Sequence, residues 1–349
     1  MTTRPMKVGI LGAGKVTPMY LPNLVASEKV ELVAVGDVSL EAAEQLAIKY
    51  DIPQFMSIDS FVDSDIELVL NLTPMSVHYE TNMRMLRAGK HVYSEKPLGG
   101  TTRESAEVIA LAAELGLILA CAPDTLLGPG FQAGRRALDE GIIGKPISAV
   151  ASMLRPLAKK EVHREGTFPI YDMAPYYISA LVHLFGPARS MTSISQLGAE
   201  HPAVYAFGSI VFADDVLASV TVRYGGDLLG ETSVLHVYGT SGVLEMPNPD
   251  VFLEAARWRS YGDTEWQVVP TDTEAPGGRV NLRGIGIDDM IDALRAGQQP
   301  SAPADVAMHV VEIIESLCRG DSGGEGRPHP LQTTCNHPAP VALRTGSDT

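Results

Sequence analysis

The chain has 349 residues, of which 45% are hydrophobic and 20% charged, a composition typical of a globular protein of about two domains. Its formal net charge of −15 argues against nucleic-acid binding, because the phosphate backbone repels such a chain unless it carries a concentrated basic patch. Three widely spaced cysteines argue against a metal site or a disulfide framework. The lack of a long apolar segment argues against a secretory signal or membrane association, and we therefore predict a cytoplasmic protein.

The first 125 residues alternate between short apolar runs and stretches with helical periodicity. The predicted strands are residues 7–11, 31–37, 66–72, 90–95 and 117–123. The predicted helices between them lie around residues 20–26, 40–50, 78–89 and 101–116. Near-continuous apolar strands that alternate with helices predict a parallel sheet buried on both faces, hence an α/β domain over residues 1–124.

The pattern changes after Asp124. One helix, residues 131–144, is followed by strand-like runs at 147–154, 206–213, 216–224, 232–239 and 243–246. Successive strands with few intervening helices predict an α+β domain with a mainly antiparallel sheet over residues 125–320. Two late helices, 286–297 and 304–320, are candidates to pack back on the first domain. Residues 321–349 are polar and rich in Gly, Pro, Ser and Thr, which predicts a loosely ordered tail.

A glycine turn directly follows the first predicted strand. Gly12 permits a tight turn and Gly14 allows the backbone to approach a pyrophosphate at the start of the next helix. Thr17 replaces the third glycine of the G-x-G-x-x-G pattern, so the motif is incomplete. We predict that the turn, including Lys15 and Val16, binds a dinucleotide.

An acidic residue, Asp37, ends the second predicted strand. A carboxylate there accepts hydrogen bonds from both ribose hydroxyls and repels a 2′-phosphate. The next residues are Val38 and Ser39, without an arginine. This pattern favours NAD over NADP, although an exposed aspartate at a strand end is the alternative.

Polar residues also follow the third long strand. Asn71 lies near its end and Thr73 and Pro74 come after it, at the edge where open parallel sheets bind ligands, so we expect them to line the dinucleotide. His78 lies in the first turn of the next helix. Its side chain would contact the cofactor ribose or be solvated, and the sequence does not decide between these.

The fourth strand is followed by Glu95, Lys96 and Pro97. Together with the glycine turn, "NLTP" with its downstream histidine, "GKHVYSEKPL" and "PIYDMAPYYISALVHLFG", this block resembles the Gfo/Idh/MocA family of NAD(P)-dependent oxidoreductases over about the first 320 residues. The resemblance implies a Rossmann domain followed by an open-faced, mainly antiparallel sheet domain. It also implies that Lys96 is the family lysine and that a cis proline, Pro97, follows it. All three residues are candidate cofactor contacts, and Glu95 would either steer the lysine or line the nicotinamide pocket through its backbone.

The resemblance extends to a block in the second domain. It places Asp172 at the family's first acid and Tyr176 at its histidine or tyrosine position. Ala174 and Ser179 depart from the family's glycine and second acid. We predict that Tyr176 is the acid/base, that Lys96 polarises the substrate oxygen and lowers the pKa of the phenol, and that Asp172 orients a hydroxyl or the lysine.

Four further residues are candidate substrate contacts. His183 falls on the same helical face as Asp172 but also suits a buried structural position. Asp124 would bind a hydroxyl or cap the next turn. Arg155 and Arg164 belong to a short basic cluster that would bind an anionic group or remain a solvated loop.

The predicted function is therefore hydride transfer between NAD, or less favoured NADP, and a secondary alcohol or ketone of a sugar, polyol or related cyclic compound. The alternatives are an NAD-dependent glycosidase that oxidises a sugar transiently and a non-catalytic dinucleotide-sensing regulator. The second-domain strands carry apolar residues on both faces, which predicts a homodimer or homotetramer through that sheet.

Overall fold

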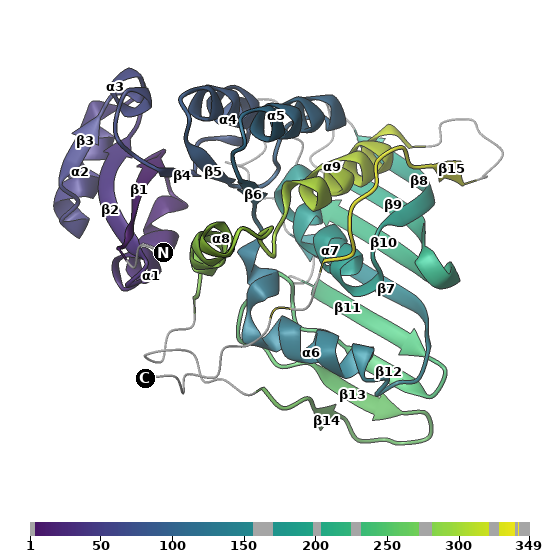
Figure 1. Cartoon of the computed structure of the whole chain (residues 1–349). Coiled ribbons are helices and arrows are strands. Elements are labelled where there is room, and N and C mark those ends of the chain that lie inside the picture. Colours follow the sequence, from purple (N-terminus) through teal and green to yellow (C-terminus); the bar gives the residue numbers. More distant parts are fainter. Residues whose placement is uncertain are drawn as a thin grey trace. The chain divides into compact units, whose positions relative to one another are not determined.

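The computed structural model describes residues 4–155, 170–197, 204–224, 232–271, 281–320, 328–338 and 341. The chain divides into two compact units (Figure 1). The first contains residues 1–124 and 281–308, and the second contains residues 125–280 and 309–349. One division falls after Asp124, and residues 281–308, which include the late helix predicted over 286–297, belong to the first unit. The predicted domain bounds stay a prediction.

A six-stranded parallel sheet forms the centre of the first unit (Figure 1). Its strand order is β3-β2-β1-β4-β5-β6, the Rossmann order with a crossover beside β1. The strands are β1 (Met6–Leu11), β2 (Val30–Gly36), β3 (Gln54–Met56), β4 (Leu68–Asn71), β5 (His91–Ser94) and β6 (Leu119–Cys121). The α/β prediction is confirmed, although β3 is too short to have been recognised from its sequence.

Helices cover both faces of this sheet. They are α1 (Thr17–Val25), α2 (Leu40–Tyr50), α3 (Ile58–Val62), α4 (His78–Arg87), α5 (Thr102–Glu114) and α8 (Ile285–Ala296). Two apolar cores result, because one contains residues of α1, α2 and α8 and the other contains residues of α4 and α5. Local sequence fixes several helix starts: Ser39 caps α2 and Thr101 caps α5 through side-chain oxygens that accept backbone N–H groups.

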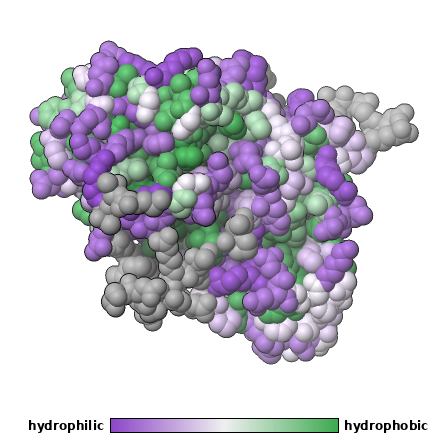
Figure 2. Space-filling model, viewed as in Figure 1, coloured by the Kyte–Doolittle hydropathy of each residue, from purple (hydrophilic) through white to green (hydrophobic). Residues whose placement is uncertain are grey.

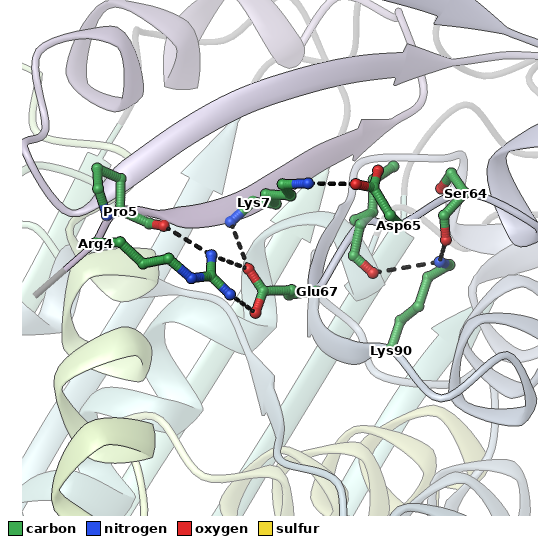
Figure 3. Close-up of polar contacts among 8 residues, drawn as sticks. Arg4, Pro5, Lys7, Ser64, Asp65, Glu67 and Lys90 are labelled. Carbon is green, nitrogen blue, oxygen red and sulfur yellow. Dashed lines mark hydrogen bonds and ion pairs between the residues drawn. The ribbon is translucent and has the colours of Figure 1, made fainter. Parts of the chain in front are cut away.

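Charged side chains connect the amino ends of the strands (Figure 3). The Arg4 guanidinium donates two hydrogen bonds, of 2.8 and 2.7 Å, to Glu67, and the Lys7 ammonium pairs with Asp65. Lys90 donates to the carbonyl oxygen of Ser64 at 2.7 Å. Because ligands of such sheets bind at the opposite, carboxyl edge, we interpret this cluster as a structural tie between β1, β4 and β5.

The second unit is built on a mostly antiparallel sheet. In the described residues its order is β14-β13-β12-β11-β7-β10-β9-β8-β15, and β7 and β10 pair in parallel. The strands are β7 (Pro146–Arg155), β8 (Ala188–Leu197), β9 (Val204–Phe212), β10 (Leu217–Tyr224), β11 (Thr232–Gly239), β12 (Gly242–Glu245), β13 (Arg257–Ser260), β14 (Gln267–Val268) and β15 (His329–Pro330). This sheet confirms the predicted α+β class.

Helices lie on one face of this second sheet (Figure 1). They are α6 (Pro129–Asp139), α7 (Ile170–Phe185) and, from His309 onward, α9 (Ala304–Arg319). Large hydrophobic side chains point outward on the other face, where Ile194, Phe207 and Leu217 are 73, 48 and 54% exposed. This open face is where the sequence predicts a homodimer or homotetramer contact, which stays a prediction.

Part of the predicted loose tail is docked on the second unit. β15 pairs with β8, and the Thr333 backbone N–H donates to Glu312 at 2.8 Å. The His337 ring lies 2.9 Å from the His183 carbonyl oxygen, and Val341 donates to the Gln132 side chain at 3.0 Å. The tail prediction is corrected for these residues, because polar residues can dock through backbone hydrogen bonds that composition does not reveal.

The surface on the side seen in Figure 2 mixes hydrophilic and hydrophobic residues. In the part of the chain that the structure describes, no helix combines the length and the apolar character needed to cross a membrane.

Candidate active site

The glycine turn between β1 and α1 is packed against the segment that follows β4. Gly12 has a φ of +105°, and a Cβ there would lie 2.7 Å from the Leu72 carbonyl group, so only glycine fits. A Cβ on Gly14 would meet no atom within 4 Å, so the space above the turn is open. The Thr17 hydroxyl donates to the Gly12 carbonyl oxygen at 2.7 Å, which explains a threonine at the third glycine position.

Asp37 is tied to the same turn. Its Oδ2 accepts the Ala13 backbone N–H at 2.7 Å, and its Oδ1 accepts the Ser39 N–H at 2.8 Å. The half-buried carboxylate thus lies beside the glycine turn and is oriented by two backbone donors. Lys15 and Val16 are exposed in the turn.

Side-chain hydrogen bonds of Asn71, the last residue of β4, hold the loop that follows this strand. Its buried amide donates to Thr81 and Asn82 of α4 at 2.8 and 2.7 Å, and its oxygen accepts the Thr73 hydroxyl at 2.7 Å. Thr73 is half-buried and Pro74 is exposed. The Asn71 side chain therefore holds the loop to α4, and a cofactor contact of this loop falls more naturally to Thr73 and Pro74.

His78 is buried, with 1% of its surface exposed. Its Nδ1 lies 2.7 Å from the Pro97 carbonyl oxygen and its Nε2 lies 2.7 Å from the Thr73 carbonyl oxygen. Burial lowers the pKa of the ring below its ordinary value, against the opposing effect of the two carbonyl groups. The solvated alternative is therefore wrong, since the ring is buried and both nitrogens face backbone carbonyl groups. The contact with the cofactor ribose stays a prediction.

Lys96 follows β5 in a turn that is held by the buried side chain of Glu95. The buried Glu95 carboxylate accepts the Lys96 backbone N–H at 2.9 Å and the Tyr20 phenol at 2.5 Å. The Lys96–Pro97 peptide is cis, as the resemblance implied. Burial, with a smaller contribution from Glu95, raises the pKa of Tyr20 well above its ordinary value, so Tyr20 remains a donor. Helix α1 and the Lys96 turn are thus joined by one buried hydrogen bond.

Asp124 caps a helix. It is fully buried, and its Oδ2 accepts the Gly284 backbone N–H at 2.7 Å at the start of α8. Burial raises the pKa of its carboxyl to about 6, although the nearby Arg283 guanidinium and two backbone N–H groups act in the opposite direction. Asp124 therefore caps a remote helix and not the next turn, as the sequence alternative had it, and its contact with a substrate hydroxyl stays a prediction.

The free energy of unfolding should depend on pH through the protonation of the Asp124 carboxyl. Because its pKa of about 6 lies above the ordinary 3.8, the folded state binds the proton more tightly than the unfolded chain. The resulting stabilisation is complete below the ordinary pKa and is lost as the pH rises through about 6. Asparagine does not titrate, so Asp124→Asn should not show this loss. The unfolding free energy of Asp124→Asn minus that of the wild type should therefore increase by on the order of 2–3 kcal/mol when the pH is raised from about 4 to about 7. Denaturant titrations at both pH values measure the difference, and a constant difference contradicts the assignment.

The second unit carries the remaining candidates on or near α7. Asp172 and Tyr176 are four residues apart on this helix, Asp172 being exposed and Tyr176 3% exposed. The Tyr224 phenol donates to Asp172 at 3.5 Å. His183 is buried, and its Nδ1 lies 2.8 Å from the Ser179 carbonyl oxygen in an edge contact with Phe131. This favours a structural role for His183.

Only one arginine of the basic cluster can be placed. Arg155, at the end of β7, forms an ion pair with Asp250 at 3.2 Å. Its charge is thus partly offset, which weakens the case for an anion site, and Arg164 lies outside the described residues. Nearby, the Tyr177 phenol donates to the Ser233 hydroxyl at 2.5 Å and packs α7 onto β11.

The sequence assigned no role to Tyr20 or Arg283, and Thr17 was noted only as a departure from the glycine pattern. A signal existed for Tyr20, because it lies three residues after Thr17 and therefore on the same buried face of α1. Arg283 comes from a segment about 160 residues after Asp124, and no local pattern indicates that the chain returns to this edge of the sheet.

Comparison with known proteins identifies both units. Residues 6–122 match the oxidoreductase family with the NAD-binding Rossmann fold, and residues 131–245 match the GFO/IDH/MocA C-terminal domain. The chain belongs to the Gfo/Idh/MocA oxidoreductase family. It is therefore an NAD(P)-dependent oxidoreductase.

Named relatives of this Gfo/Idh/MocA protein act on sugars and inositols. It is 29% identical over 261 residues to the D-glucoside 3-dehydrogenase of Escherichia coli, with 67% of this chain and 71% of that protein covered. It is also 29% identical over 252 residues to the NAD(+)-dependent scyllo-inositol 2-dehydrogenase of Bacillus subtilis, with 68% and 72% covered.

Solved structures share the fold. An aldose-aldose oxidoreductase from Caulobacter crescentus complexed with glycerol aligns with a TM-score of 0.80 at 20% identity, over 94% of this chain and 100% of that one. A 3-ketoreductase from Actinomadura kijaniata in complex with TDP-benzene and NADP aligns with a TM-score of 0.76 at 21% identity, over 90% and 96%.

The residues of the first unit fit a dinucleotide. The open space above Gly14 would admit a pyrophosphate at the start of α1, and the Asp37 carboxylate lies beside this turn. Among the described residues, no group of three His, Cys, Asp or Glu side chains is placed to hold a metal ion.

Proposed function

We propose that this protein is an NAD-dependent dehydrogenase that oxidises a secondary alcohol of a sugar, polyol or related cyclic compound, with Lys96 and Tyr176 as its catalytic pair. The observation that carries the proposal is the Lys96 turn. Its backbone is held by the buried Glu95 carboxylate, which is itself bonded to helix α1 of the dinucleotide turn. The lysine is thus anchored at the carboxyl edge of a Rossmann sheet, where ligands bind.

Two groups of this chain would serve the reaction. The bound nicotinamide supplies a hydride acceptor. Tyr176 takes the hydroxyl proton, and the Lys96 ammonium stabilises the developing negative charge on the substrate oxygen. A phenol has an ordinary pKa near 10, and a nearby ammonium lowers it toward the range where a base is effective. Lys96 and Tyr176 belong to different units, so their meeting is part of the proposal.

The substrate class is supported by the named relatives, which act on glucosides and inositols. A panel of sugars and polyols, each offered with NAD and with NADP, tests it through the absorbance of the reduced nicotinamide. At least one neutral sugar or polyol should reduce NAD. A panel that gives product without net reduction would favour the glycosidase alternative.

Asp37 is proposed to set the preference for NAD. Replacing it by serine removes the charge that repels a 2′-phosphate and the acceptor for the ribose hydroxyls. We expect kcat/KM for NAD to fall about ten- to hundredfold, the range for a hydrogen bond to a charged group, and the NAD/NADP ratio to fall with it. Steady-state kinetics with both cofactors measure this ratio. Asp59→Ser is the matched control, because the Asp59 side chain is exposed on α3. An unchanged ratio in Asp37→Ser refutes the assignment.

A further inference from the structure

His78 faces two acceptors with its two ring nitrogens. The Pro97 carbonyl oxygen lies 2.7 Å from Nδ1, and the Thr73 carbonyl oxygen lies 2.7 Å from Nε2. A neutral imidazole carries one N–H, so it can donate to only one of them, and its other nitrogen then presents a lone pair to a carbonyl oxygen. Only a doubly protonated ring satisfies both contacts.

The two carbonyl groups belong to different parts of the candidate active site. Pro97 continues the turn that carries Lys96, whereas Thr73 lies in the loop after β4 that we propose to line the dinucleotide. The charged groups that act on the ring are Glu95 and Lys96, whose effects on its protonation are opposite. Burial favours the neutral ring, so one carbonyl lacks its donor at neutral pH.

Burial also decides which carbonyl has the stronger need for the proton. The contact with Pro97 is buried, whereas the contact with Thr73 is only partly buried. A carbonyl oxygen that can reach water loses little without a protein donor, but a buried one loses the full desolvation free energy. The neutral ring should therefore carry its proton on Nδ1.

We propose that His78 is a positioning residue that holds the Lys96 turn through Nδ1–H and leaves the Thr73 loop without a donor until the ring is protonated. This inference rests on the proposed roles of Lys96 and of the Thr73 loop. On this proposal the Nδ1 contact of His78 affects turnover through the Lys96 turn, and its Nε2 contact affects cofactor binding through the Thr73 loop.

A pair of substitutions separates the two contacts. The amide nitrogen of asparagine has about the reach of Nδ1, and that of glutamine has about the reach of Nε2. His78→Asn should keep kcat within about twofold of the wild type, whereas His78→Gln should lower kcat about tenfold, the effect of one lost hydrogen bond. His78→Gln, which gives the Thr73 carbonyl a permanent donor, should also change the Kd of NADH measured by nicotinamide fluorescence, and His78→Asn should not.

Nitrogen-15 NMR of the imidazole in the intact protein provides a readout that needs no activity. At neutral pH the His78 signals should show a protonated Nδ1 and an unprotonated Nε2. The opposite tautomer, or equal kinetic effects of the two variants, would overturn the proposal. His91→Gln is the folding control, because His91 lies at the amino end of β5, where its Nδ1 accepts the Ile118 N–H.

The same set of variants separates this inference from the proposed function. If Lys96→Met abolishes turnover while the two His78 variants behave alike, only the His78 proposal fails. If Lys96→Met keeps wild-type turnover, the catalytic assignment fails and the tautomer measurement still decides the position of the proton.

Discussion

Replacing Lys96 by methionine should lower kcat by about a hundredfold or more, because removing one group that stabilises the developing charge costs about 10²–10³ in kcat. Methionine keeps most of the side-chain volume and removes only the ammonium group. The Glu95 carboxylate would still accept the backbone N–H of residue 96. The loss should therefore appear in kcat, while the thermal stability and the Kd of NADH change little. Stopped-flow and steady-state kinetics with the best substrate of the panel measure it.

Lys49→Met is the control for the Lys96 substitution, because Lys49 lies exposed on α2 over the Tyr50 ring, outside the candidate site. Tyr176→Phe should produce a loss similar to that of Lys96→Met if the two side chains act together. Near wild-type turnover in Lys96→Met would refute its catalytic role. A normal Tyr176→Phe enzyme beside an inactive Lys96→Met enzyme would refute only the pairing.

Replacing Gly12 by alanine should abolish measurable NADH binding and destabilise the first unit. The new Cβ would lie 2.7 Å from the Leu72 carbonyl group in a residue with a φ of +105°. Left-handed backbone alone costs a side-chain-bearing residue on the order of 1–3 kcal/mol, and the clash displaces the turn or the Thr73 loop in addition. Isothermal titration with NADH and denaturant unfolding measure the two effects.

Gly89→Ala separates backbone strain from the clash. Gly89 has a φ of +75°, and a Cβ there would meet nothing within 4 Å. This variant should lose stability through strain alone and bind NADH normally. If Gly12→Ala bound NADH like Gly89→Ala, the turn would not be the dinucleotide site.

The sequence predicted the two classes of sheet because the signals for them are local. Alternating apolar runs and periodic helices indicated a parallel sheet, and Gly12, Asp37 and Lys96 could be assigned to its carboxyl edge from their positions after three strands. The same logic indicated the second domain from its run of strands. Short elements such as β3 and β15 escaped, because two or three residues carry no period. The ten-residue strand β8 was missed as well, because its sequence is mostly polar and lacks an apolar run.

The direction of individual side chains could not be predicted in this way. Asn71, His78 and Asp124 all follow strands at the ligand edge, yet each side chain bonds to backbone or to a neighbouring helix. The position of a residue relative to a strand fixes where its backbone lies, but the partners of its side chain come from remote segments such as Pro97 and Gly284. Buried polar groups must find such partners, and these are the contacts that sequence spacing does not encode.

Transfer of deuterium from a labelled substrate tests the central claim most directly. A sugar or polyol that reduces NAD in the panel would be prepared with deuterium at the reacting carbon, and the reduced nicotinamide would be analysed by proton NMR. We predict one deuterium at C4 of the nicotinamide ring with the wild-type protein and a rate at least about a hundredfold lower with Lys96→Met. Product formation with no deuterium in the nicotinamide would contradict it.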